Sequence, residues 1–176
     1  MRTLVVGAGA VGGYFGAKLV RAGVPVTFVA RGETLRRLRE RGLRIDSARE
    51  GLLRIEPVDG VESPAARGPF DLVLVCVKAQ DTADALRDVA AGLDPDAIIL
   101  SLQNGVESEE TIERLLGIPP MLRALAFIGA ESVEPGIVRH VSGGTIVVGE
   151  PDDRPSPRLD RLTSALRAAA IEVRMP

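Results

Sequence analysis

The chain opens on MRTLVVGAGAVGGYFG (residues 1–16), which joins a short apolar segment directly to a glycine-rich turn and then to a helical segment. Residues 3–6 are typical of a buried parallel strand, and a G-x-G-x-x-G pattern begins at the strand's carboxyl end. In this pattern Gly7 permits the tight turn, Gly9 keeps side-chain atoms away from a pyrophosphate, and Gly12 lets the helix pack closely on the strand.

The helix that follows this turn is expected over residues 10–22, with Gly23 just past its end. Its free N–H groups and the positive end of its dipole would face an anionic ligand. Glycines in this spacing also occur in turns that merely need flexible residues. Their place between this strand and this helix predicts dinucleotide binding.

Residues 24–30 predict a second strand, and the end of this strand indicates which dinucleotide binds. A NAD-binding unit usually carries Asp or Glu about 20 residues past the motif, where it holds the ribose 2′-hydroxyl. Here Ala30 is followed by Arg31, whose guanidinium can bind a 2′-phosphate through paired hydrogen bonds. The sequence therefore favours NADP over NAD, with an ordinary exposed arginine as the alternative for Arg31. The nearby Glu33 is expected in the first turn of the next helix.

The composition indicates one globular domain. The chain has 176 residues and a net charge of −2 with both signs interspersed, so nothing points to a nucleic acid or an anionic membrane surface. Cys76 is the only cysteine, which excludes an intramolecular disulfide and a multi-cysteine metal site. No apolar run could span a bilayer, and the first strand begins too early to leave room for a signal peptide. We therefore expect a cytoplasmic protein.

The rest of the chain predicts an α/β fold of the Rossmann type, a doubly wound and mainly parallel sheet with helices on both faces. Residues 70–77 form an almost unbroken apolar run, which is typical of a central parallel strand. Further strands are expected over 97–102 and 171–173. Helices are expected over residues 32–42, 82–91, 107–116 and 155–170.

Two segments are predicted to extend this sheet. Residues 43–58 alternate apolar and polar side chains around a turn, which suggests a β-hairpin inserted into the wound sheet. Strand-like segments at 123–128, 136–140 and 145–148 are separated by glycines and a proline. We interpret them as the far edge of the same sheet.

Ligands of doubly wound sheets lie across the carboxyl ends of the strands, so polar residues just after the apolar runs are candidates for the site. Lys78 could reach the adenosine phosphate or ribose of a dinucleotide, or be an ordinary surface lysine. Asn104, beside Gly105, could hold the nicotinamide ribose or a substrate oxygen, or cap the next helix. Cys76 is interpreted as an inert core residue and His140 as structural, because no carboxylate or second histidine is placed to orient it.

Several spaced motifs together resemble a known family. They are GAGAVGGYFGAKL (7–19), Arg31-Gly32, VCVKA (75–79), LQNGVES (102–108) and EPGIVRHVSGGTIVVGE (134–150). Through essentially its whole length the chain is similar to the amino-terminal domain of ketopantoate reductases, also called 2-dehydropantoate 2-reductases. The resemblance implies an NADPH-dependent reduction of the 2-oxo group of ketopantoate to pantoate, in the pathway to pantothenate and coenzyme A.

The resemblance also implies residue roles. Arg31 and Lys78 hold the 2′-phosphate, and Asn104 holds the nicotinamide ribose and the substrate. Ala130 lines the nicotinamide pocket through its backbone. The residues that hold the diphosphate are Gly7, Ala8, Gly9, Ala10, Val11 and Gly12.

Members of this family continue into a helical carboxyl-terminal domain, which brings the lysine that protonates the developing alkoxide and most groups that bind the substrate carboxylate. This chain ends at Met175-Pro176 without it. We therefore expect residues 1–176 to be an NADP-binding domain with no catalytic residue or metal of its own. Its expected partners are a small 2-oxo acid and either a second copy or a separately supplied carboxyl-terminal domain.

Two other hypotheses stay open. One is a stand-alone NADP-binding module that senses or regulates without turnover. The other is a domain of a dehydrogenase of 2-hydroxy acids or sugar phosphates, in which the first motif is similar. The segments around Lys78 and Asn104 argue against that second hypothesis.

Overall fold

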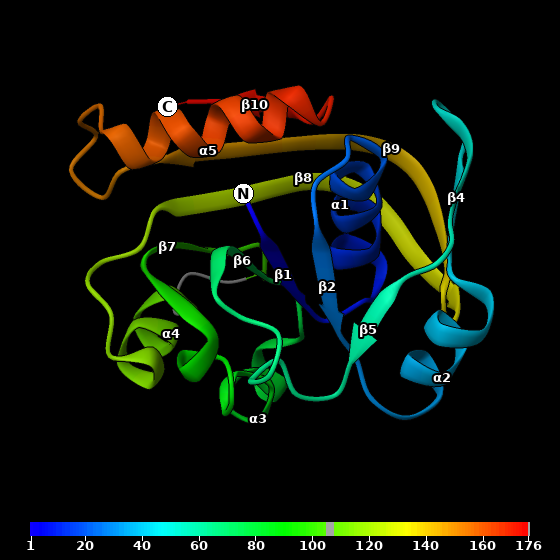
Figure 1. Ribbon diagram of the computed structural model, residues 1–176. Helices are drawn as coiled ribbons and strands as arrows, with labels where there is room; N and C mark the ends of the chain where they lie inside the picture. The colour runs from blue at the N-terminus through cyan, green and yellow to red at the C-terminus, as the bar shows by residue number, and fades with distance from the viewer. Residues whose placement is uncertain (105–107, 176) are drawn as a thin grey trace.

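The structure of the protein is a computed structural model that describes residues 1–104 and 108–175 (Figure 1). Short 3₁₀ helices occupy Ala79–Asp81 and Ala90–Gly92. The other elements, in chain order, are β1 (Thr3–Val6), α1 (Ala10–Arg21), β2 (Val26–Val29), α2 (Gly32–Arg41), β3 (Leu43–Ser47), β4 (Gly51–Ile55), β5 (Asp59–Val61), β6 (Phe70–Val75), α3 (Thr82–Leu86), β7 (Leu93–Ser101), α4 (Ser108–Leu116), β8 (Arg123–Glu134), β9 (Ile137–Gly149), α5 (Pro157–Ala168) and β10 (Glu172–Arg174).

A five-stranded parallel sheet carries the amino-terminal motif. Its strand order is β5-β2-β1-β6-β7, and every neighbouring pair is parallel. The strands β1 and β2 are buried along their whole length, as expected of strands covered on both faces. Side chains of α1 join the core on one face, while α3 and α4 cover the other (Figure 1). The predicted Rossmann-type fold is confirmed.

Several element boundaries differ from the sequence expectation. Strand β7 begins at Leu93, earlier than expected, and includes Pro95, which an end strand of a sheet tolerates because one of its edges needs no hydrogen bonds. Helix α3 is shorter than expected and gives way to turns after Leu86. Helix α5 starts at Pro157, where the Ser156 hydroxyl accepts a hydrogen bond from the backbone N–H of Leu159.

A second sheet holds the segments that we had assigned to the first. Strand β9 pairs with β8 in antiparallel orientation, and with β3 and β10 in parallel orientation at its two ends. The hairpin over residues 43–58 forms as β3 and β4, but it joins this second sheet and only β5 returns to the parallel sheet. The predicted insertion into the wound sheet and the predicted far edge are therefore wrong.

The glycines that suggested separate short strands instead introduce irregularities within two long ones. The register of β8 against β9 shifts between Phe127 and Ile128, opposite Gly143. Gly143 has φ 77° and Gly144 has φ 105°, conformations that glycine adopts readily. Such bulges bend and twist a strand without ending it, so β9 runs on through this point.

Helix α1 lies between the two sheets and is buried from Gly12 to Leu19 without interruption. A Cβ atom at Gly16 would lie 2.4 Å from the Phe28 ring of the parallel sheet. On the other side, a Cβ atom at Gly13 would lie 3.0 Å from Val138 Cγ2 of the second sheet. Small residues on both faces therefore allow this helix to contact both sheets.

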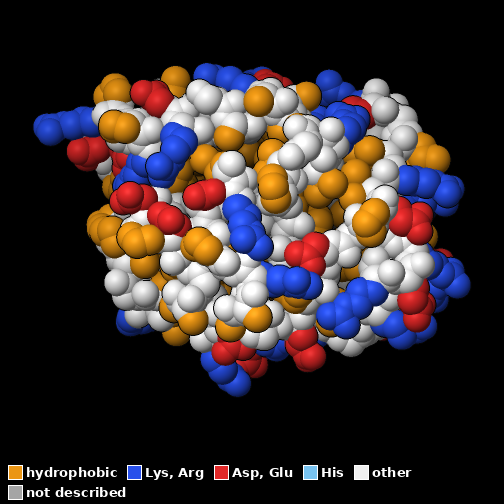
Figure 2. Space-filling model, viewed as in Figure 1, with side chains coloured by type: hydrophobic (Ala, Val, Ile, Leu, Met, Phe, Trp, Pro, Cys, Tyr) orange, Lys and Arg blue, Asp and Glu red, His pale blue; other side chains and the backbone are white. Residues whose placement is uncertain are grey.

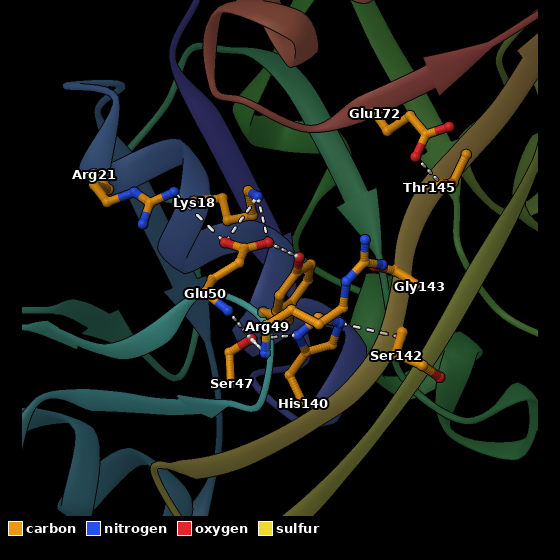
Figure 3. Close-up of polar contacts among 11 residues, drawn as sticks. Lys18, Arg21, Ser47, Arg49, Glu50, His140, Ser142, Gly143, Thr145 and Glu172 are labelled. Carbon is orange, nitrogen blue, oxygen red and sulfur yellow. Dashed lines mark hydrogen bonds and ion pairs between the residues drawn. The ribbon is translucent and has the colours of Figure 1, made fainter.

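A partly buried polar cluster joins α1 to the turn between β3 and β4. The Tyr14 hydroxyl donates to Glu50 Oε1 at 2.7 Å, and Lys18 Nζ donates to both carboxylate oxygens at 2.9 and 3.0 Å (Figure 3). Burial raises the pKa of Glu50, but the hydrogen bonds from Lys18 and Tyr14 outweigh it and hold that pKa below its ordinary value. Burial, reinforced by the hydrogen bond to Glu50, raises the pKa of the Tyr14 hydroxyl.

His140 belongs to the same region and is completely buried. Its Nδ1 lies 2.8 Å from Ser47 Oγ and its Nε2 lies 3.1 Å from the carbonyl oxygen of Ser142 (Figure 3). Since a carbonyl can only accept, Nε2 carries the proton, and Nδ1 accepts from the serine. The ring also packs on Tyr14, with centroids 4.3 Å apart. The structural role predicted for His140 is confirmed.

Charged side chains of both signs are interleaved over the face drawn in Figure 2. This pattern agrees with the small net charge of −2. In the described part of the chain, no helix is long and apolar enough to cross a membrane.

We predict that Glu50→Gln lowers the free energy of unfolding by about 1 to 3 kcal/mol, because the buried Lys18 would lose its counter-charge. The side chain of Lys18 is only 7% exposed. Since the pKa of Glu50 is lower in the folded chain, its contribution is complete above the ordinary value of 4.5 and is lost as pH falls through the folded value. Urea denaturation at neutral pH and at successively lower pH measures both effects.

Glu33→Gln is the matched control, because Glu33 makes its ion pairs on the exposed surface of α2. It should change stability little at any pH. Equal losses in the two variants would contradict the role given to the Glu50 cluster.

Candidate functional site

A cavity of about 330 Å³ opens at the carboxyl ends of the parallel strands. This is the place where doubly wound sheets bind their ligands. Its walls come from the turn after β1, the end of β2, the start of α2, the β6–α3 connection, and β8. The lining residues are Gly7, Ala8, Gly9, Val29, Ala30, Arg31, Thr34, Val77, Asp81, Asp84, Ala85 and Ser132.

The three motif glycines face different surroundings. A Cβ atom at Gly7, which has φ +100°, would lie 2.7 Å from Val77 Cγ1, and one at Gly12 would lie 2.0 Å from the Gly7 carbonyl oxygen. Those two glycines are therefore required by the packing of the protein itself. A Cβ atom at Gly9 would meet nothing within 4 Å. The bare backbone at Gly9 thus leaves free space beside the cavity, where a ligand can approach.

The amino end of α1 points its backbone N–H groups toward this space. Gly9 is the residue that precedes the helix, it supplies no side-chain hydrogen bond, and the first turn contains no acidic residue. The first N–H groups of a helix have no partners within the helix, and the dipole makes this end positive. An anionic group such as a diphosphate fits the cavity at this point.

Arg31 reaches across the cavity from the end of β2 to α3. Its Nη2 donates to the carbonyl oxygen of Asp84 at 2.8 Å. This contact joins two connections that lie far apart in the sequence. It also holds a guanidinium on the cavity wall, as predicted from the residue after Ala30.

Two carboxylates that the sequence analysis did not place here also line the cavity. They belong to Asp81 and Asp84, on the wall that Arg31 contacts. The Asp84 carboxylate accepts from Arg87 at 2.6 Å. The sequence pointed to Glu33 as the one acidic residue near Arg31, whereas Asp81 comes from the β6–α3 connection and Asp84 from α3.

Gln103 holds that connection in place and was also missed. Its side chain is buried at the end of β7, where Nε2 donates to the carbonyl oxygen of Val77 and to the Thr82 hydroxyl, both at 2.8 Å. These two bonds flank residues 78–81 on either side. A polar residue directly after a buried strand was the only signal for this role in the sequence.

Other predicted residues lie outside the cavity lining. Lys78 is exposed before the first 3₁₀ helix, and Asn104 is exposed after β7. The predicted turn and helix start at 105–107 fall outside the described residues. Ala130 pairs with His140 and packs against the core, whereas Ser132, two residues further along β8, lines the cavity.

The motif residues Ala10 and Val11 begin α1 and pack partly against the core. Cys76 lies beside Gly12, and burial raises the pKa of its thiol to about 12, which agrees with an inert core residue. Within residues 1–104 and 108–175, no group of three or more His, Cys, Asp or Glu is placed to hold a metal ion.

Fold and cavity together define a Rossmann-type protein with an anion-accepting turn at the end of its first strand. Residues 3–153 match the family described as ketopantoate reductase PanE/ApbA. The chain belongs to this family.

Similar proteins agree with this assignment. The chain is 32% identical over 173 residues to the 2-dehydropantoate 2-reductase of Halobacterium salinarum, which covers 98% of this chain and 56% of that protein. It is 33% identical to the crystal structure of 2-dehydropantoate 2-reductase from Geobacter metallireducens, with a TM-score of 0.89 over 100% of this chain and 58% of that one. The chain therefore spans about half the length of the relatives it matches.

A more distant structure shares the fold. D-mandelate dehydrogenase in its ternary structure with NADH and anilino(oxo)acetate is 22% identical, with a TM-score of 0.88 over 100% of this chain and 57% of that one. At this identity the likeness concerns the fold alone.

Proposed function

We propose that this chain is the NADP-binding part of a 2-dehydropantoate 2-reductase, an oxidoreductase that reduces ketopantoate to pantoate. The observation that carries the proposal is the open space beside Gly9 at the amino end of α1. It suits a diphosphate, and the chain belongs to a family of ketopantoate reductases. When bound, NADPH would supply the hydride for the 2-oxo carbon.

Different residues of the chain would bind different parts of the cofactor. The turn from Gly7 to Gly12 would hold the diphosphate, and Arg31 would bind the 2′-phosphate from the end of β2. Lys78 is exposed and bears no ion pair among the described residues, so its flexible side chain could turn toward the same phosphate. Asn104 and Ala130 would serve the nicotinamide side and the 2-oxo acid. A cytoplasmic location stays a prediction from the sequence.

The proton donor and the group that binds the substrate carboxylate would come from outside these residues. Reduction of a 2-oxo acid needs a hydride donor, a proton donor and a group that binds the carboxylate. The chain would position the first, and a carboxyl-terminal helical domain would bring the other two. Its relatives are about twice as long, which leaves room for such a domain.

We predict that Gly9→Val abolishes NADPH binding and leaves the fold intact, because the isopropyl group would fill the space that the diphosphate needs. The backbone at Gly9 is extended, with φ −82° and ψ −155°, so valine can adopt it without strain. Isothermal titration calorimetry with NADPH and thermal unfolding together check this.

Gly12→Val provides the contrast, since its side chain would collide with the Gly7 carbonyl oxygen and should disturb the fold itself. Binding of NADPH by Gly9→Val with unchanged affinity would place the cofactor elsewhere.

We predict that Arg31→Ala weakens NADPH binding by about 1 to 3 kcal/mol, as expected for the loss of a charge-assisted hydrogen bond, with little effect on NADH. Arg36→Ala is the matched control, because Arg36 pairs with Glu33 and Glu40 away from the cavity. The measurement is calorimetry with both cofactors. Equal affinities of the unmutated chain for NADPH and NADH would contradict the proposed preference.

We predict that the chain alone binds NADPH but reduces ketopantoate slowly, because a missing general acid typically costs ~10² to 10⁴ in rate. The test follows NADPH absorbance with ketopantoate, for the chain alone and for the chain fused to the carboxyl-terminal part of a longer relative. Equal rates would show that the proton donor lies within these residues, with Lys78 as the first candidate. No turnover by either protein would favour a sensing module.

A further inference from the structure

We propose that Asp81 is a second determinant of cofactor choice, which opposes the effect of Arg31 on the 2′ position of the adenosine ribose. This inference rests on the proposed function. The cavity would then contain one group that favours a 2′-phosphate, the Arg31 guanidinium, and one that favours a 2′-hydroxyl, the Asp81 carboxylate.

The carboxylate of Asp81 is free to meet a ligand. Asp81 occupies the residue before α3, where an aspartate usually accepts a hydrogen bond from the helix, but its side chain makes no such bond. Among the residues that the structure describes, its carboxylate has no hydrogen bond or ion pair. It is exposed and lines the cavity beside the glycine turn.

The surroundings hold Asp81 on the cavity wall that Arg31 contacts. Arg31 donates to the carbonyl oxygen of Asp84, which lies three residues after Asp81, about one helical turn away. Gln103 binds the chain on both sides of Asp81, at the Val77 carbonyl oxygen before it and at the hydroxyl of the buried Thr82 directly after it. The backbone that carries Asp81 is therefore held from both sides, which keeps this residue at the cavity wall.

The other acidic residue of the wall already has an ion-pair partner. Asp84 accepts from Arg87 at 2.6 Å, so its carboxylate has a counter-charge outside the cavity. Asp81 has none. Among the described residues that line the cavity, Arg31 and Asp81 are thus the charged side chains without an ion pair, whereas Lys78 lies outside the lining.

These two charges act in opposite directions on the two cofactors. A 2′-phosphate carries between one and two negative charges and is attracted by Arg31 but repelled by Asp81. A 2′-hydroxyl can donate a hydrogen bond to a carboxylate, which is how acidic residues hold the ribose of NAD in this fold class. The NADPH preference given by Arg31 is therefore smaller than it would be without Asp81.

The test isolates the 2′-phosphate by comparing two small probes, 2′,5′-ADP and 5′-AMP, which differ only in that group. Calorimetry measures both affinities for the unmutated chain and for Asp81→Asn. We expect 2′,5′-ADP to bind about three- to tenfold more tightly to the variant, and 5′-AMP to bind no more tightly than before. The gain should shrink as salt is added, because it is electrostatic.

Asp88→Asn is the matched control, since it removes the same charge from an exposed position that does not line the cavity. It should leave the ratio of the two affinities unchanged. If Asp81→Asn leaves the ratio of the two affinities as it is in the unmutated chain, the role of Asp81 is overturned and the proposed function stays intact. Failure of the unmutated chain to bind either probe or NADPH would overturn the proposed function and this inference with it.

Discussion

The rest of the structure depends on the position of α1, which is packed between two sheets. A helix in this position can carry no large side chain where it crosses a strand. Gly12 and Gly16 meet the parallel sheet, and a Cβ atom on either would lie within 2.4 Å of another atom. Gly13 meets the second sheet in the same way, at 3.0 Å from Val138. The glycine-rich sequence thus serves two purposes, because the residues that clear space for packing also begin the turn that faces the cavity.

Burial of α1 on both faces creates an electrostatic requirement that the second sheet meets. Lys18 and Tyr14 are buried on the helix, so their polar groups need partners within the protein. Glu50, in the turn between β3 and β4, receives hydrogen bonds from both side chains. This cluster fixes the hairpin against the helix, and through the helix it fixes the amino end of α1 relative to β1. The cluster therefore anchors the same helix whose preceding turn lines the cavity.

The sequence predicted what depends on local pattern and missed what depends on long-range pairing. The strand, turn and helix at the start were correct, because apolar periodicity and glycine spacing act over a few residues. The hairpin over residues 43–58 was also correct, but its alternation indicates only that one face is buried and cannot tell which sheet covers it. Gly143 was taken as a break in the chain's pairing, whereas in the structure it lies opposite a bulge within a continuous strand.

In the candidate site, too, the sequence predicted the residues that follow from local pattern and missed those that depend on long-range contacts. Gly9 and Arg31 could be found because each sits at a fixed offset from an apolar run. Asp81 could not, since its place at the cavity comes from the folding of the β6–α3 connection, and the position of Gln103 after a buried strand did not reveal which residues it would bind. The fold and the side chains therefore have separate tasks in this cavity. In the proposed function, the backbone of the glycine turn and the amino end of α1 would bind the diphosphate, which every nicotinamide dinucleotide contains. In our proposal, discrimination at the ribose would depend on the opposite charges of Arg31 and Asp81, on a wall where Arg31 also donates to the Asp84 carbonyl. Substitutions on that wall can shift the choice of cofactor while the helix, both sheets and the diphosphate surface stay unchanged.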